Sequence, residues 1–149
     1  MKKRIFLLCG IFIMIFLLCS CGISGGYSSV LDANWGFSLP AEAKCKNVYE
    51  KDAGPSFHGD GIRYHVFSYK NEEPIETLLE WSETESGTLF HGNYSNAAEV
   101  WLGEIDVPQE ERPEYEACVY WYANQEDNSE IIIFWNDVQD RLYIAESFM

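Results

Sequence analysis

The N-terminal half of the chain contains three segments in which large apolar residues alternate with small or polar ones. The last segment is the clearest, because Ile62, Tyr64 and Val66 share one face among many β-branched and aromatic residues. The alternation is weaker in the other two, and the first of them stops at Pro40. The pattern predicts strands over residues 35–40, 44–51 and 62–69.

Three more strands are predicted near the C-terminus, with turns rich in Asn, Asp and Ser between them. The second of these strands is apolar on both faces from Ile131 to Trp135, which predicts that it is the middle one of the three. The predicted segments are residues 115–123, 130–135 and 141–147.

Helical spacing occurs in the middle of the chain. Pro74 suits the first position of a helix, and Ile75 and Leu78 then lie on one apolar face. We expect this helix to end near Ser82, and a second short helix over residues 96–102. The connecting segments are a polar loop over residues 83–94 and an acidic loop over residues 106–114.

The order of strands, helix and strands is typical of an α+β domain. We expect an antiparallel sheet of about five to six strands with one or two helices packed on one face. The pattern fills residues 34–149, a length that suits one domain with a single core.

Residues 1–22 follow a different pattern. Lys2, Lys3 and Arg4 form a positive cluster, and an apolar run interrupted only by Gly10 fills residues 5–18. This arrangement is typical of a secretory signal, because the positive end stays on the cytoplasmic side while the apolar run enters the bilayer.

The end of the apolar run resembles the lipobox of bacterial lipoproteins, in the five residues Leu18-Cys19-Ser20-Cys21-Gly22. In that family a branched apolar residue and two small residues precede a cysteine that is diacylated and becomes the new N-terminus. The resemblance implies that residues 1–20 are removed and that Cys21 carries the lipid, such as palmitate. It places the domain on the extracytoplasmic side of the cell membrane, and it covers only the first 22 residues.

Two alternatives to lipidation stay open: an uncleaved membrane-spanning helix, and a cleaved signal that releases a free protein. The strongly apolar part, residues 5–19, is shorter than the roughly 20 residues that a spanning helix needs. On the lipoprotein interpretation, residues 21–33 are the lipidated cysteine and a Gly- and Ser-rich segment that we expect to be a flexible tether.

The charge of the chain excludes one class of function. Three of the ten Lys and Arg residues lie in residues 1–20 and all 24 Asp and Glu residues follow, so residues 21–149 carry seven basic side chains, 24 acidic ones and a charge of −17. Nucleic-acid binding needs a basic surface, so it is not expected. A basic partner, a cation or a solvated acidic surface is compatible with this charge.

Cysteine and histidine supply two candidate sites. Cys45 and Cys118 form a candidate disulfide in an extracytoplasmic domain, with two buried thiols as the alternative. His58, Asp60 and His65 form the densest cluster of reactive residue types. A zinc site needs three or four converging ligands, so we expect a turn that leads into a strand, with no metal and no other cofactor.

Aromatic residues crowd the C-terminal strands. Rings occur on both faces of residues 115–123, whereas one or two helices would cover only one face of the sheet. Some of these rings are therefore candidates for exposure, and Tyr120, Tyr122 and Tyr143 are the candidate contacts for a protein or glycan partner. The alternative is that these rings pack against loops and the second helix.

Catalytic motifs give little support for an enzyme. No Ser-x-x-Lys motif occurs, and Cys118 lies in the interior of a predicted strand, where a thiol is buried and inert. We expect a membrane-anchored extracytoplasmic lipoprotein whose domain binds a partner without catalysis. The alternatives are a small metal-dependent hydrolase that uses residues 58–65, and a tethered immunity or inhibitor protein that meets a basic target.

Lipidation at Cys21 is directly testable. Cells that express the wild-type chain and grow with a fatty-acid analogue should incorporate the label into the protein, and Cys21→Ala should abolish the labelling. Cys19→Ala is the matched control and should remain labelled, since its position only needs a small residue. Equal labelling of wild type and Cys21→Ala would rule out this anchor.

Overall fold

The computed structural model describes residues 23–40, 45–52, 61–70, 73–82 and 89–149. The chain divides into two compact units, Met1–Ser38 and Leu39–Met149, each of which is taken by itself. Three predicted site residues, Cys21, His58 and Asp60, lie outside the described residues. In the part that the structure describes, no helix is long and apolar enough to cross a membrane.

Helix α2 (Ile23–Trp35) makes up most of the described part of the first unit. Tyr27 and Leu31 follow its first residue at intervals of four, which gives the sequence an apolar stripe at helical spacing. Gly36 ends the helix in the left-handed region at φ 76°, and its N–H donates to the carbonyl of Asp32 over 3.0 Å. This is the usual C-terminal cap of an α-helix, and glycine adopts it without steric cost.

Helix α2 corrects two predictions. Residues 21–33 were expected to form a flexible tether, and the chain is helical from Ile23 onward. The strand predicted over residues 35–40 is also absent, because residue 35 ends the helix and residues 37–40 have no regular structure. The Gly and Ser content suggested flexibility, whereas the four-residue apolar spacing determined the structure. With a rise of about 1.5 Å per residue, α2 is roughly 20 Å long.

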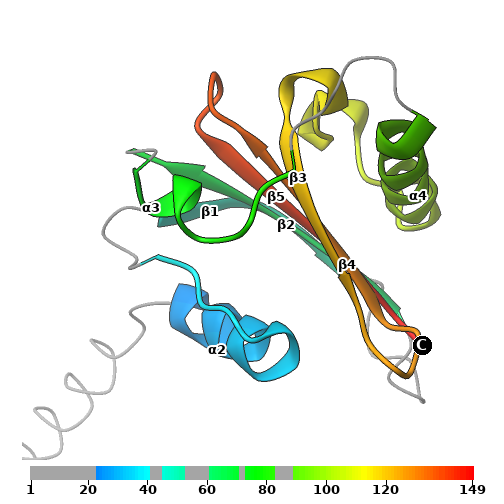
Figure 1. The fold of residues 1–149 in the computed structure, drawn as a ribbon, viewed down its shortest axis with the longest axis horizontal. Coiled ribbons are helices and arrows are strands. Elements are labelled where there is room, and N and C mark those ends of the chain that lie inside the picture. Colours follow the sequence, from blue (N-terminus) through cyan, green and yellow to red (C-terminus); the bar gives the residue numbers. More distant parts are fainter. Residues whose placement is uncertain (1–22, 41–44, 53–60, 71–72, 83–88) are drawn as a thin grey trace, which may run out of the picture. The chain divides into compact units, whose positions relative to one another are not determined.

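The second unit contains a five-stranded sheet in the order β1-β2-β5-β4-β3, with every neighbouring pair antiparallel (Figure 1). The predicted α+β class with an antiparallel sheet is therefore confirmed. The prediction that residues 130–135 form the middle strand of the last three is also confirmed. The strands are β1 (Cys45–Asp52), β2 (Gly61–Tyr69), β3 (Val119–Asn124), β4 (Glu130–Asn136) and β5 (Arg141–Phe148).

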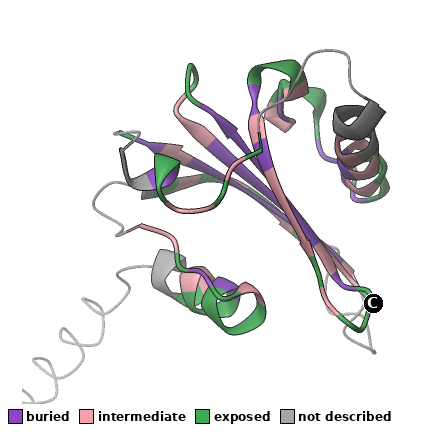
Figure 2. Ribbon diagram, viewed as in Figure 1, coloured by how far each residue is buried: buried purple, intermediate pink, exposed green. Residues whose placement is uncertain are grey.

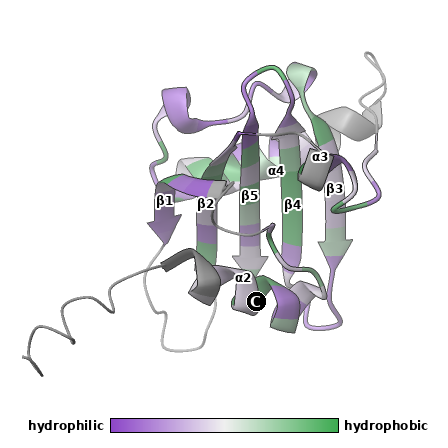
Figure 3. Cartoon of the chain, turned by 90° about the vertical axis from the view of Figure 1, so that its left-hand side faces the viewer, coloured by the Kyte–Doolittle hydropathy of each residue, from purple (hydrophilic) through white to green (hydrophobic). Residues whose placement is uncertain are grey.

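The inner strand β4 is apolar on both faces, and the edge strand β1 is not. Figure 3 shows β4 as hydrophobic along most of its length and β1 as hydrophilic. In β4 every residue after Glu130 is buried, and in β5 the run from Leu142 to Glu146 is buried (Figure 2). Strands buried on both faces read as continuous apolar runs, which is why β4 could be placed from its sequence.

Helix α4 (Leu89–Glu104) covers one face of this sheet (Figure 1). Ala98 and Leu102 are fully buried, and Tyr94 packs against the same core from one turn earlier. Because this stripe begins before residue 96, the helix is longer than the predicted helix over residues 96–102. The loop predicted over residues 83–94 is therefore wrong from residue 89 onward. The sheet residues of this core are Ile62, Tyr64, Val66, Tyr120, Ile132, Phe134, Tyr143 and Ala145, and Cys118 joins them from just before β3.

The helix predicted from residue 74 to residue 82 is a single turn, α3 (Glu73–Glu76). The indole N–H of Trp81 donates to the carbonyl of Ile75 over 2.8 Å. Ser82 then pairs with Tyr120 through two backbone hydrogen bonds of 2.8 and 3.2 Å. The chain leaves the helix early because it must turn to reach the β3 edge of the sheet.

Strand β1 contains an irregularity that changes which side chains share a face. Asn47 lies opposite Phe67, whereas Tyr49 lies opposite Val66, so the register shifts between them. Residues directly opposite each other point to the same side of a sheet. Asn47 and Tyr49 therefore point to opposite faces, although their spacing in sequence predicts one face, and Val48 between them is exposed.

The face opposite α4 carries a row of charged residues across three strands. Arg63 on β2 lies opposite Asp52 on β1 and opposite Glu146 on β5. Its guanidinium lies 3.4 Å from the Asp52 carboxylate and 3.8 Å from that of Glu146, which is fully buried. It also lies over the Phe148 ring at 5.0 Å. A buried carboxylate needs such a cation, because an unpaired charge in the interior is costly.

Candidate functional site

The loop between α4 and β3, residues 105–118, begins with a well-formed helix cap. The N–H groups of Asp106 and Val107 donate to the carbonyls of Gly103 and Leu102 over 3.2 and 2.9 Å, which is the Schellman pattern. Asp106 occupies the left-handed position at φ 54°, which aspartate tolerates better than most residues. Val107 is buried, so the loop is attached to the core from its start.

Arg112 connects this loop to helix α4. Its Nε and Nη2 donate to the carbonyl of Val107 over 3.0 and 2.8 Å, and its Nη1 donates to Glu99 over 2.7 Å. The other oxygen of Glu99 accepts the hydroxyl of Tyr115 over 2.8 Å. One carboxylate on the helix is thus bonded to two points of the loop, and the Arg112 side chain keeps only 14% of its surface exposed.

Two tyrosines attach the same loop to the sheet. The hydroxyl of Tyr64, a fully buried residue on β2, donates to the carbonyl of Glu111 over 2.6 Å. The ring of Tyr115 stands edge-on to Phe134 of β4, with ring centroids 5.0 Å apart. Burial raises the pKa of both tyrosine hydroxyls, so they stay protonated and donate at neutral pH.

Three hollows follow one another around residues 109–119. The first is lined by Gln109, Glu110, Arg112, Pro113, Glu114, Gln139, Arg141 and Tyr143. The second is lined by Ser95, Glu99, Gln109, Pro113, Glu114, Tyr115, Glu116 and Ala117. The third is lined by Glu76, Trp81, Glu116, Ala117, Cys118, Val119, Trp135 and Asp137. Neighbouring hollows share residues, so they form one continuous surface at the end of the sheet where β3 begins.

Carboxylates dominate this surface. Arg112 is already bonded to Glu99, and Arg141 lies 3.9 Å from the carboxylate of Glu111. Within the described part of the chain, Glu110, Glu114 and Glu116 form no ion pair. We call the six carboxylates that line the hollows the acidic surface: Glu76, Glu99, Glu110, Glu114, Glu116 and Asp137.

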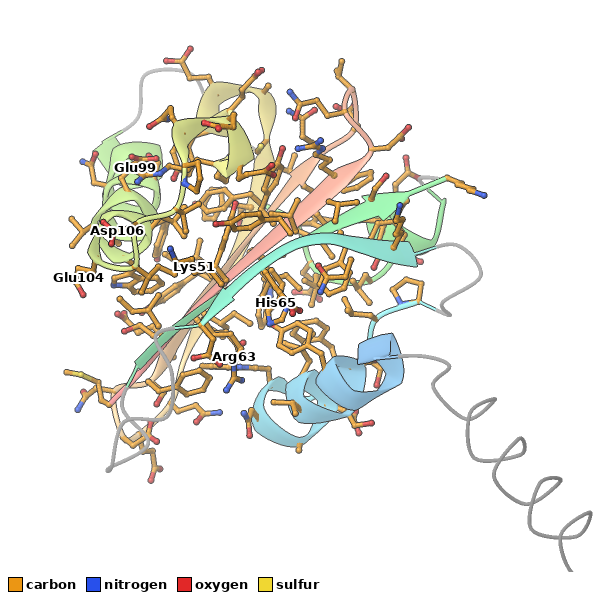
Figure 4. All side chains as sticks on the ribbon, turned by 180° about the vertical axis from the view of Figure 1, so that it is seen from behind. Lys51, Arg63, His65, Glu99, Glu104 and Asp106 are labelled. Carbon is orange, nitrogen blue, oxygen red and sulfur yellow. The ribbon has the colours of Figure 1, made fainter. Side chains whose placement is uncertain are left out.

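Figure 4 shows that charged residues lie on both sides of the sheet. Glu99 and Glu104 project from α4, and Lys51 of β1 lies near Asp106, to whose carbonyl its ammonium donates over 3.3 Å. Arg63 and His65 lie on the face of the sheet opposite α4, and neither residue lines any of the three hollows. Of the described lysines and arginines, only Arg112 and Arg141 line any of the three hollows, so the surface attracts cations.

The tyrosines predicted as an exposed platform lie mostly in the core. Tyr120 and Tyr143 keep only 7% and 1% of their surface exposed, because α4 covers their face of the sheet. Tyr122 is half-buried, with its hydroxyl donating to Glu130 over 2.6 Å and its ring 4.5 Å from that of Tyr94. The prediction of an exposed platform is therefore wrong for Tyr120 and Tyr143.

The candidate disulfide is also corrected. Cys45 starts β1 and Cys118 precedes β3, and these strands are the two edges of the sheet. Four strand spacings of about 4.8 Å separate them by roughly 19 Å, whereas bridged cysteines lie within about 7 Å. Cys118 is a free, buried thiol. Burial, assisted by the charge of Glu114, raises its pKa to about 12, so the thiol stays protonated and is not a nucleophile at neutral pH.

The histidine cluster is described only in part. His65 is buried on β2 with its Nδ1 3.9 Å from the Glu50 carboxylate. Burial, and then the nearby charge of Arg63, lower its pKa to about 4 against the opposing effect of Asp52, so His65 is neutral near pH 7. Among the residues described, no group of three or more His, Cys, Asp or Glu side chains is arranged to hold a metal ion.

One further catalytic pattern can be assessed from the backbone. Residues 22–26 match Gly-x-Ser-x-Gly, the sequence motif of the nucleophile elbow in hydrolases. The elbow places its serine on a sharp turn between a strand and a helix. Here α2 already begins at Ile23, before the serine, so the motif does not form that turn.

The sequence pattern did not identify the network that attaches the loop to α4. Glu99 was not singled out in the predicted helix over residues 96–102. Residues 115–117 were assigned to a strand, whereas they form a 3-10 turn. One signal was available. Arg112 is the only basic residue among seven acidic ones over residues 99–116, and an isolated arginine in such a run indicates an internal partner.

Comparisons with known proteins add no relative. No protein-family model, no curated protein sequence and no solved structure matches the chain.

Arg112 should contribute more to stability than an arginine on the surface nearby. Arg112→Met removes three hydrogen bonds and leaves Glu99 without its cation, so the free energy of unfolding should fall by about 2–3 kcal/mol. Urea denaturation measures this loss, and hydrogen exchange should speed up over residues 105–118. Arg141→Met is the matched control and should cost less than about 1 kcal/mol, since its one ion pair is long and partly exposed. Equal losses would contradict the role given to Arg112.

His65 should make stability depend on pH. The unfolded chain binds a proton at His65 with a pKa near 6.5, and the folded chain does so only near 4, so protonation favours unfolding. Stability should be complete above about pH 6.5 and fall as the pH drops toward 4. Between pH 7 and 4.5 the wild type should lose about 2 kcal/mol more than His65→Gln, which cannot titrate. Parallel losses in urea titrations of the two proteins would show that His65 is not the group responsible.

Proposed function

We propose that this protein is a lipid-anchored, extracytoplasmic binding protein, and that its second unit binds a basic polypeptide on the acidic surface. The observation that carries the proposal is the succession of three hollows lined by carboxylates around a loop held in place on both sides. A surface built in this way is preorganised, which lowers the entropy lost on binding.

The charges of the acidic surface favour a cationic ligand. Six carboxylates line the hollows, and one of the two arginines there, Arg112, is bonded inside the protein. A net charge of −14 for the whole chain adds a long-range attraction that speeds the encounter with a basic partner. The same field repels nucleic acids and anionic ligands.

The shape of the surface favours an extended polypeptide over a compact ligand. The hollows follow one another instead of forming one deep cavity, and Pro113 and Glu114 line both the first and the second. Alternate side chains of an extended chain point the same way at intervals of about 7 Å. Lysine or arginine at alternate positions could therefore enter successive hollows.

The anchor is proposed from the sequence of residues 1–21, with the lipid on Cys21. A protein attached to a membrane meets its partner at a raised local concentration, so moderate affinity for a basic segment would be enough. A tethered inhibitor of a basic enzyme is one form of this proposal. A glycan partner is less favoured, because that expectation depended on an exposed tyrosine platform, and Tyr120 and Tyr143 are buried.

The binding proposal can be tested with a fluorescent peptide of alternating lysine and serine. The full chain in non-ionic detergent should bind it with an affinity that falls as salt rises, and should not bind the same peptide with glutamine in place of lysine. Fluorescence anisotropy measures both affinities.

Charge reversal locates the binding surface. Glu114→Lys should weaken binding about three- to tenfold, because it changes the charge between the first two hollows. Glu126→Lys makes the same change in the exposed β3–β4 turn, at the other end of β3, and should weaken binding less than twofold. If the two reversals weaken binding equally, the peptide responds to net charge and the acidic surface is not its site.

A further inference from the structure

The third hollow differs in chemistry from the other two. Two indole rings line it, Trp81 and Trp135, together with the carboxylates of Glu76, Glu116 and Asp137. None of the described residues that line it is basic. Its volume of about 430 Å³ lies in the range of small-ligand pockets. A hollow with aromatic walls and only acidic charges is suited to an organic cation.

Both indoles are held in place by the fold. The N–H of Trp81 is bonded to the carbonyl of Ile75, and the next residue, Ser82, is paired to the β3 edge by two backbone bonds. Trp135 is buried on β4 and stands edge-on to Tyr69, with ring centroids 6.1 Å apart. Neither ring has to be ordered when a ligand enters, so the contact costs little conformational entropy.

The carboxylates and the indoles select the same kind of ligand. A cation near an indole face is attracted by the ring quadrupole, and the attraction grows as water is excluded. Glu116 and Asp137 are both exposed at the same end of the sheet, one shortly before β3 and one directly after β4. A neutral ligand would gain the aromatic contacts and leave these charges uncompensated. An anion would be repelled.

We infer that the third hollow is a pocket for the side chain of one arginine. A guanidinium is planar, stacks on aromatic rings and pairs with carboxylates through several donors, whereas an ammonium is a strongly hydrated point charge. The inference rests on the proposed function, since the arginine would belong to the basic polypeptide. It adds a specific anchor to a surface that otherwise attracts any cationic chain.

The test uses N-acetyl-arginine amide and its neutral isostere, N-acetyl-citrulline amide. The full chain in non-ionic detergent is labelled with ¹⁵N in its tryptophans, and the Trp81 and Trp135 indole signals are assigned with Trp81→Phe and Trp135→Phe. Arginine amide should shift both signals and saturate, lysine amide should bind more weakly, and citrulline amide should leave them unchanged. Equal shifts with arginine and citrulline, or shifts confined to other tryptophans, would overturn the pocket.

Matched variants distinguish binding in a specific pocket from a general effect of the protein's negative charge. Glu116→Gln with Asp137→Asn should weaken arginine amide binding about three- to tenfold. Glu104→Gln with Glu126→Gln removes two exposed carboxylates that line none of the three hollows, and should change the affinity less than twofold. Equal weakening by both pairs would refute a specific pocket.

The pocket and the proposed function can fail independently. If arginine amide shifts the two indole signals but no basic peptide binds, the pocket stands and the polypeptide proposal falls. If the lysine peptide binds at the acidic surface while arginine amide leaves both indoles unchanged, the surface stands and the pocket falls.

Discussion

The acidic surface depends on the bonds made by Arg112. Residues 99–116 carry seven carboxylates and one basic side chain, so the segment repels itself wherever it folds back on α4. Arg112 neutralises Glu99 on α4 and bonds twice to the carbonyl of Val107. With the charge nearest the core compensated in this way, the remaining carboxylates can stay exposed in water, where mutual repulsion is weak and a cationic ligand can reach them.

The position of the surface follows from the order of the strands. Because β3 is an edge strand, the segment around Ser82 can pair with it from outside, and this pairing brings Trp81 to the third hollow. The loop reaches β3 from α4 by crossing the core face, where Tyr64 and Tyr115 attach it. The hollows thus form where three connections meet at one end of the sheet. Loops held on a rigid sheet are a common place for binding sites.

The sequence predicts local periodicity well and long-range partners poorly. The strand over residues 130–135 could be placed in the middle of the last three because it is apolar on both faces. Tyr120 and Tyr143 were candidates for an exposed platform, because nothing in the local pattern shows that α4 would cover their face of the sheet. The apolar stripe of α4 begins before residue 96, outside the predicted helix. The irregularity beside Val48 and the bonds of Arg112 depend on residues on other elements, so no spacing rule reveals them. The composition of residues 23–35 suggested a flexible segment, and only the four-residue apolar spacing indicated the helix.

The distribution of neutral and charged groups favours binding over catalysis on this surface. The described groups with reactive chemistry, Cys118 and His65, are buried, and burial holds each in its neutral form at pH 7. The exposed groups around residues 109–119 are mainly carboxylates, and among the described residues Glu110, Glu114 and Glu116 form no ion pair. An ordinary carboxylate in water is a weak base and a weak nucleophile. Such groups contribute through their charge, which acts over several ångströms and needs no exact alignment. A row of them beside two fixed indoles is therefore suited to the proposed recognition of a cationic side chain, for which charge alone is enough.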